Sequence, residues 1–157
     1  VLGSREPDLK LSRDAIARIA RGSDVSVVGA EAGAATSLNA RRAVAEARYM
    51  ARVANRSDPY WEREALRNAD AIRPFLDRPR VTVVTFQLDR NGHVSGLHVS
   101  ESSGIEAIDR VALTTIRMSA PYDPLPPELA ARGVTVQHTF RWEPRGLLGS
   151  TVPGAAP

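Results

Sequence analysis

The sequence predicts an α+β domain: a three-stranded antiparallel sheet made of a β-hairpin and a third edge strand, with one helix packed on it and additional N-terminal helices. Three observations support this fold class. Apolar and polar residues alternate in 83–88 and in 134–142, as they do in half-buried strands. Asn91-Gly92, a frequent hairpin turn, comes soon after the first of these segments. From 105 to 118 the apolar residues instead have helical spacing.

The hairpin has a defined expected register. A two-residue type I′ loop, with positive φ at both central residues, makes Arg90 pair with His93. The apolar pairs across the hairpin are then Phe86 with Leu97 and Val84 with Val99. This register agrees with the hydrophobic pattern because it places all four side chains on one face of the sheet.

The helix after the hairpin is predicted to start at a capping box formed by Ser103 and Glu106. Its apolar stripe ends near Met118 and is expected to cover the apolar face of the hairpin. Prolines between 121 and 127 then favour a rigid, extended connector over a ligand for an SH3-type domain. The third strand returns beside the first strand and therefore forms a border of the sheet.

Acidic residues on this helix are assigned ordinary structural roles. Glu106 is expected to pair with Arg110, which lies one turn further along the helix. Asp109 is expected to stay hydrated. Neither carboxylate is therefore a candidate for a catalytic acid.

The N-terminal part of the chain is expected to contribute helices and linkers. Asn39 caps a helix that reaches about Arg56, and Asp58-Pro59 starts another helix, which Pro74 ends. The stretch before Asn39 is rich in Gly and Ala, but three of its residues could still add a strand: Val25, Val27 and Val28. The expected organisation is a linker at 1–38 with a possible short helix at 12–21, a domain at 39–143 with its core at 81–143, and a flexible tail at 144–157.

Composition argues against several classes of function. The net charge is +3, but basic and acidic residues are interspersed, as in Arg63-Glu64, and aromatic residues make up only 5% of the chain. A nucleic-acid-binding surface is therefore not expected. The chain has no cysteine, which excludes disulfides and thiolate metal sites. No run of eighteen apolar residues predicts a transmembrane span, and we expect the chain to be a fragment of a longer protein.

No catalytic residue, metal site or cofactor is predicted. Ser102-Ser103-Gly104 lacks the Gly-x-Ser-x-Gly spacing of a nucleophile elbow. The three histidines have no other metal ligands beside them: His93 lies near the turn, His98 on the second strand and His138 in an apolar stripe. We interpret His98, on the face opposite Phe86 and Leu97, as a solvated or helix-packed residue. We interpret His138 as a buried histidine with satisfied hydrogen bonds, and a partner contact or a pH-sensitive edge is the alternative.

The order of short motifs along the second half of the chain is distinctive. In chain order they are Phe86-Gln87-Leu88, Asp89-Arg90-Asn91-Gly92, Val94, Leu97, Val99, Ser102-Ser103-Gly104, Ile108-Asp109, Val111-Ala112, Ile116, Ala120-Pro121-Tyr122 and Phe140. Residues 81–142 thereby resemble the C-terminal domain of the TonB and TolA family. Leu38-Asn39-Ala40-Arg41 is similar to the segment that precedes this domain in TonB-like proteins. A Tyr-Pro pair frequent in TonB itself is here Pro59-Tyr60, so the subfamily stays open.

This resemblance implies the periplasmic domain of an energy transducer anchored in the inner membrane of a Gram-negative bacterium, with the anchor and a spacer before Val1. It implies an ExbB/ExbD-like motor driven by the proton-motive force, an outer-membrane TonB-dependent receptor as partner, and no cofactor. The alternative within the family is a TolA-like or motility-related structural adaptor that bridges the two membranes. An enzyme is a third hypothesis, for which the sequence offers no cluster of ionisable residues.

The expected binding site is the third strand. An edge strand exposes N–H and C=O groups, to which an extended peptide can add through main-chain hydrogen bonds. We expect the receptor peptide to bind six residues: Thr135, Val136, Gln137, His138, Thr139 and Phe140. The same edge could pair with a second copy of the chain, so a homodimer is an open alternative.

Overall fold

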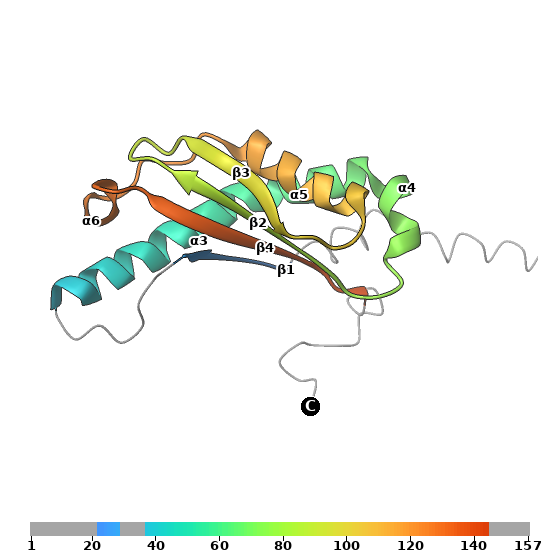
Figure 1. The fold of residues 1–157 in the computed structure, drawn as a ribbon, viewed down its shortest axis with the longest axis horizontal. Helices are drawn as coiled ribbons and strands as arrows, with labels where there is room; N and C mark the ends of the chain where they lie inside the picture. The colour runs from blue at the N-terminus through green and yellow to red at the C-terminus, as the bar shows by residue number, and fades with distance from the viewer. Residues whose placement is uncertain (1–21, 29–36, 145–157) are drawn as a thin grey trace, which may run out of the picture.

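The computed structural model describes residues 22–28 and 37–144 of the chain, which form a four-stranded antiparallel sheet with helices packed on one face (Figure 1). The strands are β1 (Gly22–Val27), β2 (Arg80–Leu88), β3 (Val94–Glu101) and β4 (Val134–Trp142). The helices are α3 (Ser37–Arg67), α4 (Ala69–Ile72), the 3-10 helix η2 (Arg73–Phe75), α5 (Glu106–Ser119) and α6 (Pro127–Ala130). The predicted α+β class is therefore correct, with four strands in place of three.

β2 and β4 form the centre of the sheet, and their side chains confirm the predicted alternation. In β2, Val84, Phe86 and Leu88 are buried, whereas Gln87 between them is exposed. The corresponding buried residues of β4 are Val134, Val136, His138, Phe140 and Trp142. α3 and α5 lie on the face to which these side chains belong, so burial is confined to every second residue.

The β2–β3 hairpin keeps the predicted face, but its register is interrupted. Val84 lies opposite Val99, as the sequence predicted. A register shift at Phe86 removes its predicted pairing with Leu97. Such irregularities twist a strand locally, and here they fall beside β3, which forms one border of the sheet.

The predicted two-residue turn is wrong, because the loop of this hairpin runs from 89 to 93. The carboxylate of Asp89 accepts hydrogen bonds from the backbone N–H groups of Asn91 and His93, at 2.8 and 2.9 Å. Gly92 takes a positive φ of 84°, but Asn91 does not, and a type I′ turn requires both. The Asp89 side chain thus stabilises a longer loop, in which Arg90 and His93 do not pair.

α3 is one continuous helix where the sequence predicted two. It begins at Ser37, before the predicted cap Asn39, and runs through Pro59 to Arg67. A proline inside a helix costs about 3 kcal/mol. Buried residues lie on both sides of it: Tyr49, Met50, Val53, Trp61 and Ala65. Their burial offsets this cost, and Pro74, the predicted helix end, lies in η2.

α5 occupies the predicted helix, but the predicted capping box does not form. Ile105 is at the N-cap position, without a side-chain cap. The hydroxyl of Ser103 donates to the carboxylate of Asp109 at 2.7 Å and accepts the N–H of Ile105 at 3.1 Å. Asp109 is therefore a hydrogen-bonded residue at the start of the helix, and the prediction that it stays hydrated is wrong. The predicted pair of Glu106 with Arg110 is present at 3.2 Å.

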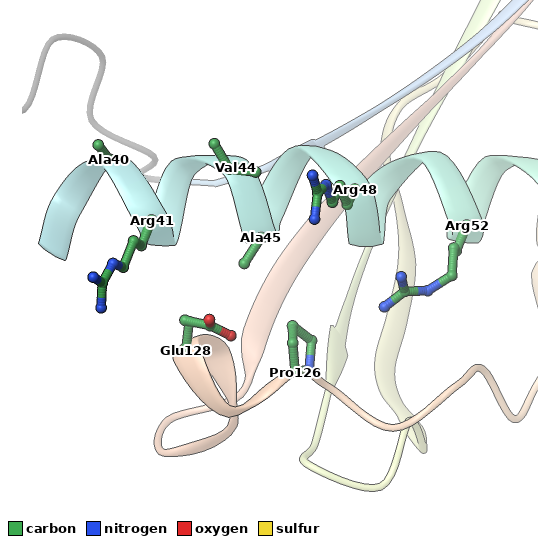
Figure 2. Close-up of a pocket in the computed structure, with 8 residues that line it drawn as sticks. All are labelled: Ala40, Arg41, Val44, Ala45, Arg48, Arg52, Pro126 and Glu128. Carbon is green, nitrogen blue, oxygen red and sulfur yellow. The ribbon is translucent and has the colours of Figure 1, made fainter. Parts of the chain in front are cut away.

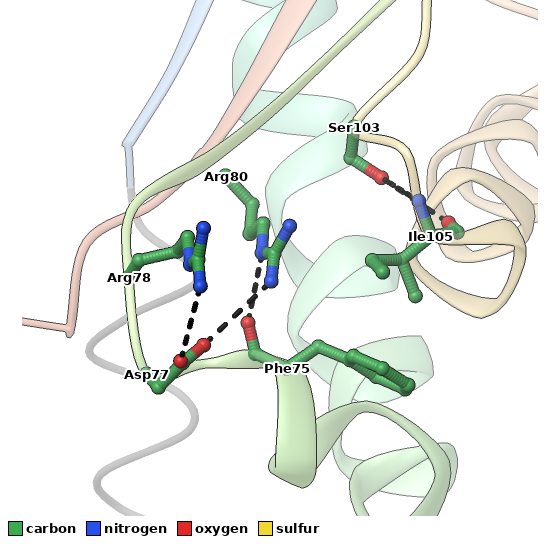
Figure 3. A network of polar contacts seen from close by, with 6 residues as sticks. All are labelled: Phe75, Asp77, Arg78, Arg80, Ser103 and Ile105. Atoms are coloured by element: carbon green, nitrogen blue, oxygen red, sulfur yellow. Dashed lines mark hydrogen bonds and ion pairs between the residues drawn. The ribbon is translucent and has the colours of Figure 1, made fainter.

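A small polar cluster fixes the entry into β2 (Figure 3). Arg80 Nε donates to the carbonyl oxygen of Phe75 at 2.9 Å, and its guanidinium lies 3.6 Å from the Asp77 carboxylate. Arg78 lies 3.8 Å from the same carboxylate. These contacts join η2 to the sheet, and their ion pairs add little to stability because the Asp77 carboxylate that they share is exposed.

β4 is an interior strand, which corrects the prediction that it is an edge. Its predicted place beside the first hairpin strand is confirmed, since Val84 of β2 pairs with His138. Residues 22–27, which fall in the predicted linker, form β1 on the other side of β4. The strand that the valines of this stretch could add is therefore present. The predicted helix at 12–21 and the tail from 145 onwards lie outside the described residues.

Candidate functional site

The six residues predicted to bind a partner lie together on β4, between β1 and β2. Three of their side chains are buried in the core: Val136, His138 and Phe140. Gln137 is exposed, and Thr135 and Thr139 are half-buried on the opposite face. What β4 offers to a neighbouring strand is therefore mainly its backbone.

The backbone groups of β4 face its two neighbours alternately. The N–H of Val28 donates to the carbonyl oxygen of Thr135 at 2.9 Å, so Thr135 is a hydrogen-bonded position towards β1. Such positions recur at every second residue of an antiparallel pair. The N–H and C=O groups that face β1 thus belong to Thr135, Gln137, Thr139 and Arg141, which we call the β1-facing residues of β4.

β1 is held against β4 mainly by main-chain pairing. Its register runs from Gly22 opposite Arg141 to Val27 opposite Val136. The carboxylate of Asp24 lies 3.1 Å from the guanidinium of Arg141, but these side chains are 68% and 45% exposed. Exposed ion pairs contribute little, and screening by salt reduces them further. Among the side chains of β1 that the structure describes, the half-buried Val25 and Val27 pack against the core.

An open groove of about 460 Å³ lies between β1 and α3. Val25 and Val27 are among the residues of β1 that line it. On the α3 side the lining residues are mostly small and apolar: Ala43, Ala47, Met50, Ala51 and Ala54, together with Glu46. The valine side chains leave this space unfilled, so the groove has room for larger apolar side chains at the same two positions of a strand.

His138 lies at the centre of this site, fully buried. Its ring stacks on Phe140, with centroids 4.1 Å apart and planes 14° apart. Neither ring nitrogen has a hydrogen-bond partner among the described residues, so the prediction of satisfied hydrogen bonds is wrong. Burial lowers the pKa of His138 to about 3, and the imidazole is therefore neutral at physiological pH.

The other two histidines lie on the exposed surface of the described part of the chain. His98 is exposed, as predicted, and His93 is exposed beside the Asp89 carboxylate, 3.4 Å away. Within residues 22–28 and 37–144, no group of three or more His, Cys, Asp or Glu residues could hold a metal ion. No helix in the same part of the chain is long and apolar enough to cross a membrane.

A second groove, which the sequence analysis missed, lies between the N-terminal part of α3 and α6 (Figure 2). Its lining residues are Ala40, Arg41, Val44, Ala45, Arg48, Arg52, Pro126 and Glu128. Arg41, Arg48 and Arg52 are seven and four residues apart, a spacing that places them on one helix face. Val44 is 49% exposed beside them. This combination suits contact with an acidic, partly apolar segment.

Residues 81–144 match the protein family described as Gram-negative bacterial TonB protein C-terminal. The match contains β3, α5, α6, β4 and nearly all of β2, whereas β1 and α3 lie outside it. No match was found among curated proteins or among solved structures. The matched segment is the one in which the order of motifs resembles this family.

Proposed function

Since residues 81–144 belong to the TonB C-terminal family, whose domains are periplasmic and bind proteins without catalysing reactions, we propose that the chain is the partner-binding part of a TonB-like energy transducer. A proton-motive motor of ExbB/ExbD type in the inner membrane drives the transducer. The domain binds an extended peptide of an outer-membrane TonB-dependent receptor. That peptide adds as a strand to the β1-facing residues of β4.

The observation that supports this proposal most directly is that an extended segment already adds to β4. β1 lies outside the family-matched region, yet its six residues pair with β4 in continuous register. Within residues 81–144 alone, β4 has β2 on one side and no strand on the other. The family-matched region therefore contains a sheet border whose geometry accepts an added antiparallel strand.

Main-chain binding of this kind places only modest demands on the sequence of the peptide. Affinity comes from the N–H and C=O groups of β4, and alternate side chains of the peptide enter the space beside α3. Arg141 can meet an acidic residue of the peptide, as it now meets Asp24. The preferred peptide thus carries apolar residues at alternate positions and an acidic residue near one end.

The experiment that tests this function is a titration of the ¹⁵N-labelled full chain with synthetic peptides from the TonB boxes of TonB-dependent receptors. We expect saturable binding, with the largest amide shifts at Thr135, Gln137 and Thr139. If none of the peptides binds, the transducer function is rejected, and co-purification with a soluble periplasmic protein would then favour a TolA-like adaptor.

Peptides with N-methyl groups provide a matched control. Methylation at every second residue removes either the N–H groups that point to β4 or those that point away from it. Strand addition predicts that one set of methyl groups abolishes binding and that the set shifted by one residue leaves it intact. Equal loss of binding with both sets would contradict a strand-addition mode.

A further inference from the structure

We infer that β1 is an internal competitor of the receptor peptide: it occupies the strand position on β4 that the peptide requires, and the peptide binds by replacing it. This inference rests on the proposed function, because it concerns the regulation of the same site. It goes beyond that function by assigning a role to a segment outside the family-matched region.

The two strands exclude each other because they need the same atoms. β1 pairs with β4 from Val136 to Arg141, and the N–H of Val28 extends the pairing to the carbonyl oxygen of Thr135. Every β1-facing residue of β4 is therefore already opposite a residue of β1. Backbone groups in a ladder have one strand partner on each side, and β2 holds the other side of β4 over its whole length.

β1 is the shortest strand of this sheet and lies at one of its edges, as β3, with eight residues, does at the other. It has six residues, whereas β2 and β4 have nine each. None of its described side chains is buried: Val25 and Val27 are half-buried, and Asp24 and Ser26 are exposed. Strands with few buried apolar contacts and exposed hydrogen bonds open at low free energy. Release of β1 therefore leaves the core of β2, β4, α3 and α5 intact.

β1 also leaves space beside its valines unused. The groove of about 460 Å³ between β1 and α3 remains open because Val25 and Val27 do not fill it. Leucine at both positions would bury more apolar area against Ala47 and Met50. A partner strand with bulkier residues at these two positions thus gains contacts that β1 lacks. These contacts allow it to replace β1, although β1 belongs to the same chain and therefore has a high effective concentration at β4.

A reversible disulfide between β1 and β4 tests the inference in the full chain. Ser26 and Gln137 are opposite each other with exposed side chains, and the chain has no other cysteine. Hydrogen-bonded antiparallel pairs have Cα atoms about 5.5 Å apart, within disulfide range. The double variant Ser26→Cys/Gln137→Cys is titrated in its oxidised and reduced forms with the fluorescein-labelled peptide Gly-Ser-Asp-Leu-Ser-Leu-Val. This peptide is residues 22–28 of the chain with leucine in place of Val25 and Val27. We expect the oxidised form to bind at least tenfold more weakly than the reduced form.

A pair of proline substitutions gives independent evidence without cysteines. The N–H of Ser26 points to β4, because it lies two residues from Val28 in the ladder, whereas the N–H of Ser23 points away. Ser26→Pro removes a bond of the ladder and is expected to tighten peptide binding about tenfold, since more β4 is free. Ser23→Pro removes none and is expected to have a much smaller effect. Circular dichroism checks that both variants are folded.

The outcomes separate this inference from the proposed function when TonB-box peptides are titrated in parallel. The competitor role of β1 would be overturned if the oxidised and reduced forms bound the peptide equally, or if the two proline substitutions had equal effects. Binding of TonB-box peptides in the same samples would still support the transducer. In a different outcome, the leucine peptide binds the reduced form but not the oxidised form, and no TonB-box peptide binds any variant. That result would reject the proposed function and leave β1 as a displaceable strand.

Discussion

Val25 of β1 lies directly opposite His138 of β4, and the imidazole of His138 is fully buried without a hydrogen-bond partner for either nitrogen among the described residues. A buried polar group without a partner costs stability. Here the cost falls on the strand that carries the candidate site. The pairing also places β1 directly beside a residue whose pKa is lowered to about 3 by burial.

The stability of the protein is expected to fall in mild acid because of His138. Its pKa is about 3 in the folded protein, against about 6.5 in an unfolded chain. The unfolded state therefore binds the extra proton below pH 6.5, and stability is lost progressively from there down to about pH 3. Between pH 7 and pH 5 the expected loss is about 2 kcal/mol. Urea unfolding at the two pH values measures it.

His138→Leu is expected to remove this part of the pH dependence, because leucine does not titrate. His98→Leu is the matched control, since His98 is exposed on the other face of the sheet. If His138→Leu and the unmodified chain lose the same stability between pH 7 and pH 5, the buried neutral state of His138 is not the cause.

α3 lies outside the family-matched residues, and a substitution of Trp61 tests whether this helix is part of the folded domain. The ring of Trp61 packs edge-on against Phe140 and Trp142 of β4, with centroids 4.9 and 5.4 Å away. Trp61→Ala is expected to cost about 3 to 5 kcal/mol in urea unfolding, as for other buried aromatic residues. Tyr60→Ala, at the neighbouring half-buried position, should cost less than about 1 kcal/mol. Equal effects would mean that α3 does not hold β4 in place.

The strands of the core could be predicted because their apolar residues alternate on a sheet covered on one face only. Val84, Phe86 and Phe140 carry this signal, and all three are buried. The turn was not predictable from Asn91-Gly92 alone, since the Asp89 carboxylate selects a different loop. The helix likewise continues through Pro59 because of tertiary packing, which cannot be predicted from the helix preferences of the local residues.

The strand at 134–142 was predicted correctly, but its position in the sheet was not. That position depends on β1, whose only apolar signal is a few valines in a stretch of Gly, Ala and Ser. Its partner lies far away in the chain: Asp24 and Arg141 are 117 residues apart. In a short strand with half-buried side chains, the alternation of apolar and polar residues is too weak to show which strand of the sheet it pairs with.

Asp109 is expected to stabilise the junction between β3 and α5. Burial raises the pKa of its carboxyl, but hydrogen bonds donated by Ser102, Ser103 and Thr82 outweigh this and lower the pKa overall. The carboxylate therefore contributes stability at neutral pH, and this is lost as the pH falls through the lowered pKa. Asp109→Asn is expected to cost about 1 to 2 kcal/mol at pH 7, because the amide accepts fewer of these bonds.

Glu106→Gln is the control for Asp109, since it removes a carboxylate from the same helix turn. The side chains of Glu106 and Arg110 are 88% and 61% exposed, so their ion pair is expected to contribute little. Chemical denaturation at pH 7 compares the two variants. Equal stability losses would show that net charge near the helix start matters more than the hydrogen bonds of Asp109.

Substitutions of Gly92 and Gly104 distinguish two contributions to the cost of adding a side chain: the backbone conformation and steric crowding. Both have positive φ, 84° and 88°, which disfavours any side chain by about 1 to 2 kcal/mol. A Cβ on Gly104 would meet nothing within 4 Å, but a Cβ on Gly92 would lie 2.1 Å from the carbonyl oxygen of Tyr122. Gly92→Ala is therefore expected to cost about 1 to 3 kcal/mol more than Gly104→Ala in urea unfolding. Equal costs would show that the connector at Tyr122 can move away from the hairpin loop freely.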